Sequence, residues 1–304
     1  MSEVKNYQDV VNIASKHLGK VGGDGYKDTY DPALLVKIPR YLNREGYGLT
    51  GKEFKGVDVW NCYEVSAITT KGQPVAGMLK IVCPSDSENH VESKSIKLYL
   101  NSFNMTKIGD NAADCIIGIE ARVKRDLDEL LDTETTVSFY ASEFETEPLS
   151  FSDEYLDLGE VADLDQIDFT AFKSDASQLR VEDTGEEAKE VKLRSNLLRS
   201  NCRVTNQPDW GDVFIYLKGK KLPSADSLAK YIVSHRTVSH FHEEICEMIY
   251  KHLTDAFEPE QLMVSCLYTR RGGIDINPIR ATHTMLIPEF FTNPNYTIRK
   301  TLRQ

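Results

Sequence analysis

The chain has 304 residues, of which 36 are Lys or Arg and 47 are Asp or Glu, so its formal net charge at pH 7 is −11. This length allows two domains, and 40% apolar residues can supply a sizeable core. An acidic chain is unfavourable for sequence-independent nucleic-acid binding, which depends on Lys and Arg at the phosphates, so no direct nucleic-acid partner is expected. No apolar run approaches the roughly 18 residues that span a bilayer, so no membrane partner is expected either.

The six cysteines have irregular spacings and form no C-x-x-C pair. In a chain of this length the pattern indicates reduced thiols rather than a disulfide framework, and we expect a cytosolic protein.

The negative charge is concentrated in the middle of the chain. Residues 143–190 carry 16 acidic side chains against Lys173, Arg180 and Lys189, a local net charge of −13, and the rest of the chain is slightly basic. Regularly placed Phe, Tyr, Leu and Ile in this segment predict short exposed strands or loops. We place two modules at residues 1–148 and 149–304, with 149–190 as an acidic connecting segment.

Local patterns predict strands and helices in a similar order in both modules. The first is expected to contain strands at 57–70 and 74–82, a helix starting near Glu92 or Ser93, a helix at 110–131 and a strand at 135–140. The second is expected to contain strands at 193–205 and 212–217, a helical stretch from the N-cap Ser224 to Leu253 broken near His240, and strands at 262–270 and 274–279. The order favours an α+β protein with antiparallel sheets, and it allows a duplicated module.

Several familiar cofactor sites lack their motifs. The sequence contains neither G-x-G-x-x-G at a strand-to-helix turn nor H-E-x-x-H. His242 and Cys246 lie four residues apart on a predicted helix but have no third ligand nearby, so no metal site is expected.

Residues 91–100 combine a helix start with lysines. The amides at a helix N-terminus carry partial positive charge, and Lys94 and Lys97 add two full charges, which suits a phosphate. An ordinary solvent-exposed helix start has the same composition.

Residues 200–211 place a cysteine seven residues before an aspartate. Strand ends would bring Cys202 and Asp209 together, with Asp209 in a turn at 208–211. A free thiol has a pKa of about 8.5 and needs a base or a cation to act as a nucleophile. Desolvation beside Trp210 would raise the pKa of Asp209, as a proton donor requires. The alternative is a buried structural cysteine and an ordinary turn aspartate.

Two further segments have groups suited to a purine-like ligand. The carboxylate of Glu243 can accept two hydrogen bonds from the N–H and amine edge of a guanine-like base. Arg271 and Gly272 place a guanidinium beside backbone that a phosphate can approach closely. A solvated helix face and a β-turn would account for these residues equally well.

The strings VESKSIKLYLNSFN, SNCRVTNQPDWG, FHEE and YTRRGGIDINP occur together in this chain. In this combination it resembles the NADPH-dependent 7-cyano-7-deazaguanine reductases of queuosine biosynthesis. The resemblance is to the two-module form, which has E-S-K-S in the first half and the catalytic Cys in the second. YDPALLVKIPRYLNREGYGL and VWNCYEV extend it over nearly the whole chain.

The resemblance implies two tandem tunnelling-fold modules, each an antiparallel sheet with helices on one face, that associate into barrels. It implies a homodimer that uses two NADPH for the four-electron reduction of the nitrile of a small 7-deazaguanine base to an aminomethyl group. Carried over by motif, Cys202 attacks the nitrile carbon to form a thioimide and Asp209 supplies a proton. The implied base-binding residues are Val91, Glu92, Ser93, His242 and Glu243, and the implied NADPH contacts are Ser93, Lys94, Arg271 and Gly272.

Two residues depart from the family pattern, since Asn206 replaces a His and Arg203 replaces an apolar residue. Three other functions stay open. One is a cyclohydrolase-like enzyme, which needs zinc, and another is a thioimide-forming amide transferase, which should lack E-S-K-S. The third is a purine-binding module without catalysis.

Overall fold

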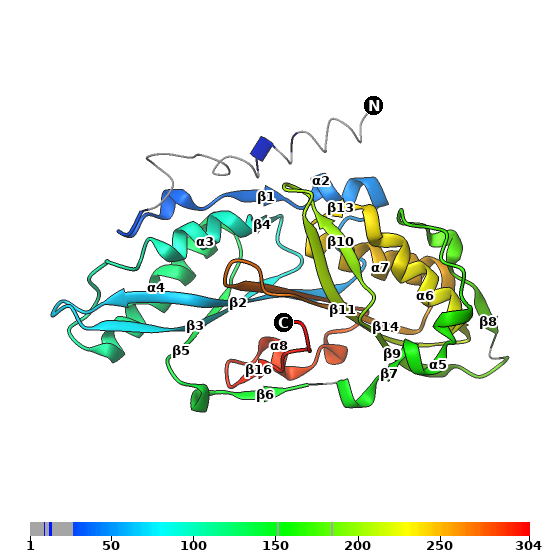
Figure 1. Cartoon of the computed structure of the whole chain (residues 1–304). Helices are drawn as coiled ribbons and strands as arrows, with labels where there is room; N and C mark the ends of the chain where they lie inside the picture. The colour runs from blue at the N-terminus through cyan, green and yellow to red at the C-terminus, as the bar shows by residue number, and fades with distance from the viewer. Residues whose placement is uncertain (1–8, 10–11, 14–26, 151, 184) are drawn as a thin grey trace.

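A single ten-stranded sheet runs through both halves of the chain (Figure 1). The structure is a computed structural model that describes residues 9, 12–13 and 27–304, except 151 and 184. In spatial order the main path of the sheet is β13 (Ser239–His240), β10 (Arg199–Cys202), β11 (Pro208–Gly219), β14 (Gln261–Tyr268), β15 (Ile274–Ala281), β2 (Lys55–Ile68), β3 (Pro74–Pro84) and β5 (Thr136–Tyr140). Off this path, β9 (Lys189–Ser195) pairs with β11, and β7 (Leu156–Asp157) pairs with β9.

The two halves meet where β15 pairs with β2. The pairing is antiparallel and runs from Ile274 opposite Cys62 to Ala281 opposite Lys55. The expected antiparallel sheets are therefore confirmed, but they are joined edge to edge into one continuous sheet. The module boundary at residue 148 stays a prediction.

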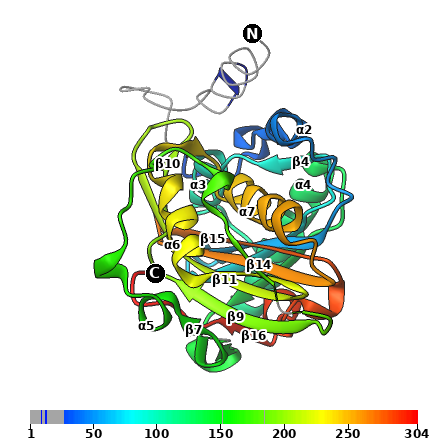
Figure 2. The ribbon, with the colours of Figure 1, turned by 90° about the vertical axis from the view of Figure 1, so that its right-hand side faces the viewer.

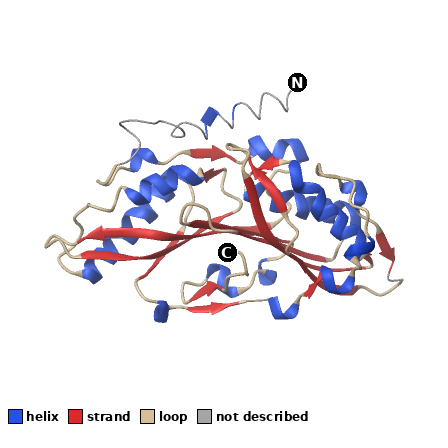
Figure 3. Ribbon diagram, viewed as in Figure 1, coloured by secondary structure: helices blue, strands red, loops and turns tan. Residues whose placement is uncertain are grey.

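Four longer helices cover one face of the sheet (Figures 2 and 3). They are α3 (Ser93–Asn101), α4 (Ala112–Leu131), α6 (Ala225–Ser234) and α7 (His242–Phe257). Each buries an apolar stripe, such as Ile119, Val123 and Leu127 of α4. The predicted helices, the Ser224 cap and the break near His240 are confirmed. None of the helices in the described part of the chain has the length and apolarity needed to cross a membrane.

The C-terminal segment after β15 covers part of the opposite face of the sheet (Figure 1). Its α8 (Glu289–Thr292) and β16 (Tyr296–Ile298) bring Phe290, Phe291 and Ile298 onto an apolar cluster of the sheet. Lys80 of β3 anchors it, because its buried ammonium donates to the carbonyls of Phe290, Asn293 and Tyr296 at 2.7–2.9 Å. Burial lowers the pKa of Lys80 to about 8, so the ammonium is still charged at neutral pH.

The remaining elements are short. They are the strand pairs β1 (Lys37–Pro39) with β4 (Asn89–Val91), β6 (Glu147–Leu149) with β16, and β8 (Val181–Asp183) with β12 (Lys221–Pro223), the helices α2 (Tyr41–Arg44) and α5 (Leu158–Val161), and eight 3-10 helices among the described residues. The 3-10 helices are η1 (Pro32–Leu34), η2 (Glu45–Tyr47), η3 (Glu143–Glu145), η4 (Ser152–Glu154), η5 (Leu164–Gln166), η6 (Ala176–Gln178), η7 (His235–Thr237) and η8 (Thr284–Leu286). The acidic segment contains the short strands β6, β7 and β8, as predicted, and also α5 and the 3-10 helices η3 to η6, which were not predicted.

Two predictions around the cysteine motif are wrong. The strand expected at 193–205 is interrupted after Ser195, and β9 and β10 are separate strands. The turn expected at 208–211 is the start of β11, where Pro208 occupies the first position, at which a strand tolerates a residue without an N–H. The actual turn lies just before it, and Asn206 has a left-handed backbone (φ 55°), which Asn tolerates better than most residues.

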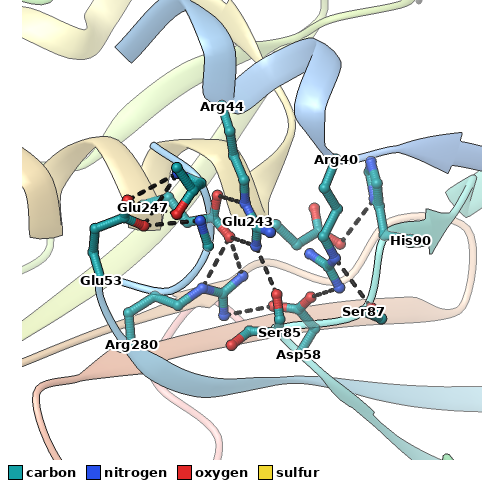
Figure 4. A network of polar contacts seen from close by, with 12 residues as sticks. Arg40, Arg44, Glu53, Asp58, Ser85, Ser87, His90, Glu243, Glu247 and Arg280 are labelled. Carbon is teal, nitrogen blue, oxygen red and sulfur yellow. Dashed lines mark hydrogen bonds and ion pairs between the residues drawn. The ribbon is translucent and has the colours of Figure 1, made fainter. Parts of the chain in front are cut away.

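A buried ion network joins the two halves beneath the helices (Figure 4). Arg280 of β15 is fully buried, and its Nη1 and Nη2 lie 2.8 Å from Asp58 of β2 and 2.8 Å from Glu247 of α7. Arg40 also contacts Asp58, at 2.6 Å, and Arg44 contacts Glu247 at 2.7 Å. Burial alone would raise the pKa of Asp58, but Arg280 and Arg40 hold that pKa well below its usual range. The network therefore consists of ionised groups that depend on one another.

Replacement of Arg280 should lower the free energy of unfolding. Arg280→Met leaves Asp58 and Glu247 with too little positive charge in a buried site, and we expect a loss of about 3–5 kcal/mol in the free energy of unfolding. The matched control is Lys251→Met, which removes a surface ion pair with Asp255 on α7 and should cost less than about 1 kcal/mol. Urea denaturation of both variants measures the difference, and equal losses would contradict a special role for the buried network.

Candidate functional site

All of the predicted site residues except Glu92 line one pocket of about 330 Å³. First-half elements contribute Val91 at the end of β4 and the first turn of α3 with Ser93 and Lys94. Second-half elements contribute Cys202, Asp209, His242, Glu243, Arg271 and Gly272. The pocket therefore lies between the two halves, and neither half forms it alone.

The thiol of Cys202 lies at the end of β10 in a setting that favours its ionised form. Lys94 Nζ lies 3.7 Å from Cys202 Sγ. Burial alone would raise the pKa of Cys202, but Lys94, the Thr205 hydroxyl and the backbone amides of Thr205 and Val204 hold that pKa below its usual value. An activated thiol needs a nearby cation, and Lys94 is that cation here. The family resemblance had implied only that Lys94 contacts NADPH.

Asp209 is buried at the start of β11, but the predicted rise in its pKa is wrong for this structure. Burial alone would raise the pKa, whereas His242, with Nε2 at 3.3 Å, and Arg271, in contact with the other carboxylate oxygen, hold it below the usual range. Trp210 does not desolvate Asp209, because adjacent strand residues point to opposite faces. Its ring instead packs against Arg199, Arg236 and Arg303.

The first turn of α7 directs polar groups into the pocket. Glu243 is only 4% exposed, and its Oε1 lies 3.7 Å from Nδ1 of His90. Among the described residues, neither Glu243 Oε1 nor either ring nitrogen of His90 has a hydrogen-bond partner. The ring of His242 stacks on Tyr268 with centroids 3.8 Å apart. Because buried polar atoms rarely stay unpaired, Glu243 and His90 are suited to a polar ligand.

Glu92 caps the helix beside the pocket and is not among the residues that line it. Its buried carboxylate caps α3, since Oε2 accepts from the amides of Lys94 at 3.0 Å and Ser95 at 2.7 Å. Its other oxygen, Oε1, lies 3.8 Å from Lys94 Nζ. These contacts favour a role in holding the first turn of α3, and direct contact of Glu92 with a base stays a prediction.

The pocket lining carries the positive charge that an anionic cofactor requires. Lys94, Lys97 and Arg271 all line the pocket. Gly272 has a left-handed backbone (φ 59°), and a Cβ there would lie 3.1 Å from Lys97 Nζ. Glycine at this position therefore leaves room for the Lys97 ammonium beside the backbone. The donor set fits the phosphates of a dinucleotide.

Several residues that line the pocket were not predicted from the sequence. They are Trp60, His90, Gln207, His240, Phe241, Ile274 and Ile276. His90 lies two residues before the E-S-K-S segment and His240 lies at the helix break, so the sequence position of each histidine could have marked it as a candidate. Trp60 and the two isoleucines read as ordinary strand core, and no local pattern separates them from it.

The two residues of the candidate metal pair have different surroundings, since His242 lines the pocket and Cys246 does not. Cys246 is fully buried, and its thiol donates to the carbonyl of Val264 at 3.4 Å. Among the described residues there is no group of three or more His, Cys, Asp or Glu side chains arranged to hold a metal ion.

Comparisons with known proteins match both halves. The family model described as "Nitrile reductase, 7-cyano-7-deazaguanine-reductase N-term" matches residues 26–139, and the model described as "QueF-like protein" matches residues 208–285. A protein of Hahella chejuensis named NADPH-dependent 7-cyano-7-deazaguanine reductase is 40% identical over 278 residues, 90% of this chain and 96% of the relative.

Two further relatives carry the same name. The protein of Rickettsia massiliae is 41% identical over 84% of this chain and 90% of its own length. The protein of Coxiella burnetii is 39% identical over 85% of this chain and 89% of its own length. With the pocket residues in place and this similarity along most of its length, the chain belongs to the NADPH-dependent 7-cyano-7-deazaguanine reductase family.

Proposed function

We propose that this protein uses NADPH to reduce the nitrile of 7-cyano-7-deazaguanine to the aminomethyl base, in queuosine biosynthesis. Family membership supports the reaction, and one observation carries it. A thiol with a lowered pKa, a buried Asp–His pair and a buried carboxylate without a hydrogen-bond partner on one oxygen line the same pocket. These are the nucleophile, the proton-transfer groups and the base-binding group that the reaction needs.

Cys202 begins the reaction. Its thiolate adds to the nitrile carbon, one electron pair of the C≡N bond moves to nitrogen, and nitrogen takes a proton to give a thioimide. This step converts a poor hydride acceptor into a C=N carbon that accepts hydride more readily. Lys94 favours the step because its ammonium stabilises the thiolate before attack.

The Asp209–His242 pair handles the proton. Since its pKa is lowered, Asp209 is ionised at neutral pH in this structure and must receive a proton before it can donate one. His242, with Nε2 at 3.3 Å, is placed to pass one to it. Movement of Arg271 from Asp209 towards a phosphate would also remove one of the two groups that lower the pKa of Asp209.

Glu243 holds the base in this scheme. Its carboxylate accepts from the N–H and amine edge, while Val91, Ser93 and His242 lie beside it. Trp60, Ile274 and Ile276 supply apolar surface for the planar ring system. A buried carboxylate paired with two donors discriminates strongly against bases that lack them.

Two NADPH molecules, each carrying one hydride, would supply the four electrons of the reduction. Ser93, Lys94, Arg271 and Gly272 are the proposed contacts, and Lys97 joins them because it lines the same pocket beside Gly272. The homodimer, the barrel assembly, the cytosolic location and the lack of a nucleic-acid partner stay predictions from the resemblance and the composition.

Loss of the thiol should abolish covalent capture. Wild-type protein mixed with the nitrile but without NADPH should gain the mass of one nitrile molecule, and Cys202→Ala should gain none, as intact-protein mass spectrometry would show. Cys115→Ala, in α4 and away from the pocket, is the control and should react like the wild type. Reversible binding by the wild type without a mass increase would indicate a purine-binding module, and failure to consume NADPH when the nitrile is present would refute the reductase.

Loss of the Lys94 charge should raise the pKa of Cys202. Because the ammonium stabilises the thiolate, Lys94→Met should move the midpoint of the pH profile for iodoacetamide alkylation upwards and slow alkylation at pH 7. Lys97→Met is the matched control, since Lys97 lines the same pocket but pairs with Glu64 at 3.5 Å. An unchanged midpoint in Lys94→Met, or an equal shift in both variants, would contradict direct stabilisation.

Loss of the Asp209 carboxyl should slow proton transfer. Asp209→Asn should lower kcat/KM by roughly 10²-fold or more, while the Kd of the base, measured in a Cys202→Ala background, changes little. Asp212→Asn on the same strand is the control, because Asp212 does not line the pocket. A loss confined to base affinity would make Asp209 a binding group instead.

A further inference from the structure

Arg203, the residue that departs from the family pattern, is buried directly after the nucleophile. It is only 6% exposed, and its Nη1 donates to Oε1 of Glu244 at 2.9 Å and to Oε2 at 2.7 Å. Glu244 is 4% exposed, so both charges of this pair are removed from water. The Arg203 guanidinium thus has a specific buried partner.

Glu244 connects that partner to the start of α7. Its Oε2 accepts from the backbone amide of Phe241 at 3.3 Å, and its Oε1 lies 2.7 Å from Nδ1 of His240. Burial alone would raise the pKa of Glu244, but His240 and Arg203 hold it below the usual value, so the side chain is a carboxylate. The β10–β11 turn is therefore tied to the helix start by a pair of full charges.

The pair spans the two sides of the proposed reaction. Cys202 directly precedes Arg203, and Glu243 directly precedes Glu244. Because consecutive Cα atoms are about 3.8 Å apart, each functional side chain is one residue from a member of the same ion pair. The Arg203–Glu244 contact therefore joins the backbone beside the thiol to the backbone beside the base-binding carboxylate.

Strand pairing reinforces the tie. Cys202 is the register partner of His240 in the parallel pairing of β10 with β13. His240 also lies 3.2 Å from the Tyr47 hydroxyl through Nε2, which brings η2 of the first half into the same group.

We propose that the Arg203–Glu244 ion pair is a positioning element that sets the distance between the Cys202 thiol and a base held by Glu243. This inference rests on the proposed function and goes beyond it, because neither residue touches the reacting atoms. Thiol addition requires the sulfur within about 3–3.5 Å of the nitrile carbon, and a displacement of 1 Å can cost about 100-fold in rate.

The test separates positioning from stability. Arg203→Leu and Glu244→Gln each leave a buried partner without its counterpart, so both single variants are expected to be less stable. The double variant R203L/E244Q removes both charges and should recover the urea midpoint of the wild type. Arg203→Lys keeps the charge and should retain part of the positioning.

Two rates of Cys202 modification are measured on the folded double variant at 25 °C. The rate of adduct formation on Cys202 with 7-cyano-7-deazaguanine, without NADPH, should fall at least 10-fold. The rate of iodoacetamide alkylation, which needs no bound base, should stay within threefold, because Lys94 and Thr205 remain. Arg203→Lys should form the adduct faster than the double variant.

A stable double variant with the wild-type adduct rate would overturn the inference and make the pair purely structural. Equal losses in both rates would also overturn it, because the pair would then act on the thiol itself. If the wild type forms no adduct, the proposed function fails instead, so the two failures are distinguishable.

Discussion

The placement of Arg280 between Asp58 and Glu247 is the interaction on which the pocket depends. A guanidinium with no exposed surface is tolerated only because two carboxylates surround it, and each of these has a second arginine. β15 supplies Arg280, β2 supplies Asp58 and α7 supplies Glu247. Since the desolvation cost is recovered only with all partners in contact, the network fixes the β15–β2 junction and the depth of α7 together.

That constraint reaches the site through α7. Glu243 lies one helical turn before Glu247, and both side chains are buried. His90 faces Glu243 and lies two residues after Glu88. The carbonyl of Glu88 accepts a hydrogen bond from the backbone amide of Arg40, a member of the ion network. The first half thus orients one side of the pocket and the second half the other, and the ion network holds the two in register. A pocket built from non-equivalent halves needs such a connection more than one built within a single module.

The sequence predicted the parts of the molecule that depend on local pattern. The stripe of α4, the cap at Ser224 and the break near His240 follow from neighbours a few residues apart. The motif residues lie far apart along the chain, and the family resemblance, not a local pattern, predicted that they share one pocket. Properties set by distant partners were not accessible. Arg280 and Lys80 look like surface residues until Asp58 and the C-terminal carbonyls are placed beside them. The pKa of Asp209 was predicted in the wrong direction because both groups that lower it, His242 and Arg271, lie far from it along the chain.

The position of Lys94 links the proposed chemical steps in order. The ammonium of Lys94 lies against the thiol and is also one of the pocket cations suited to phosphates. While Cys202 is a thiolate, the nearest negative charge to Lys94 is the sulfur or the capping carboxylate of Glu92 at 3.8 Å. Thioimide formation consumes the thiolate charge, and it thereby frees the ammonium for another anion. Under the proposed mechanism the covalent step therefore strengthens the cofactor end of the site, and the same residue serves the nucleophile first and the phosphates afterwards.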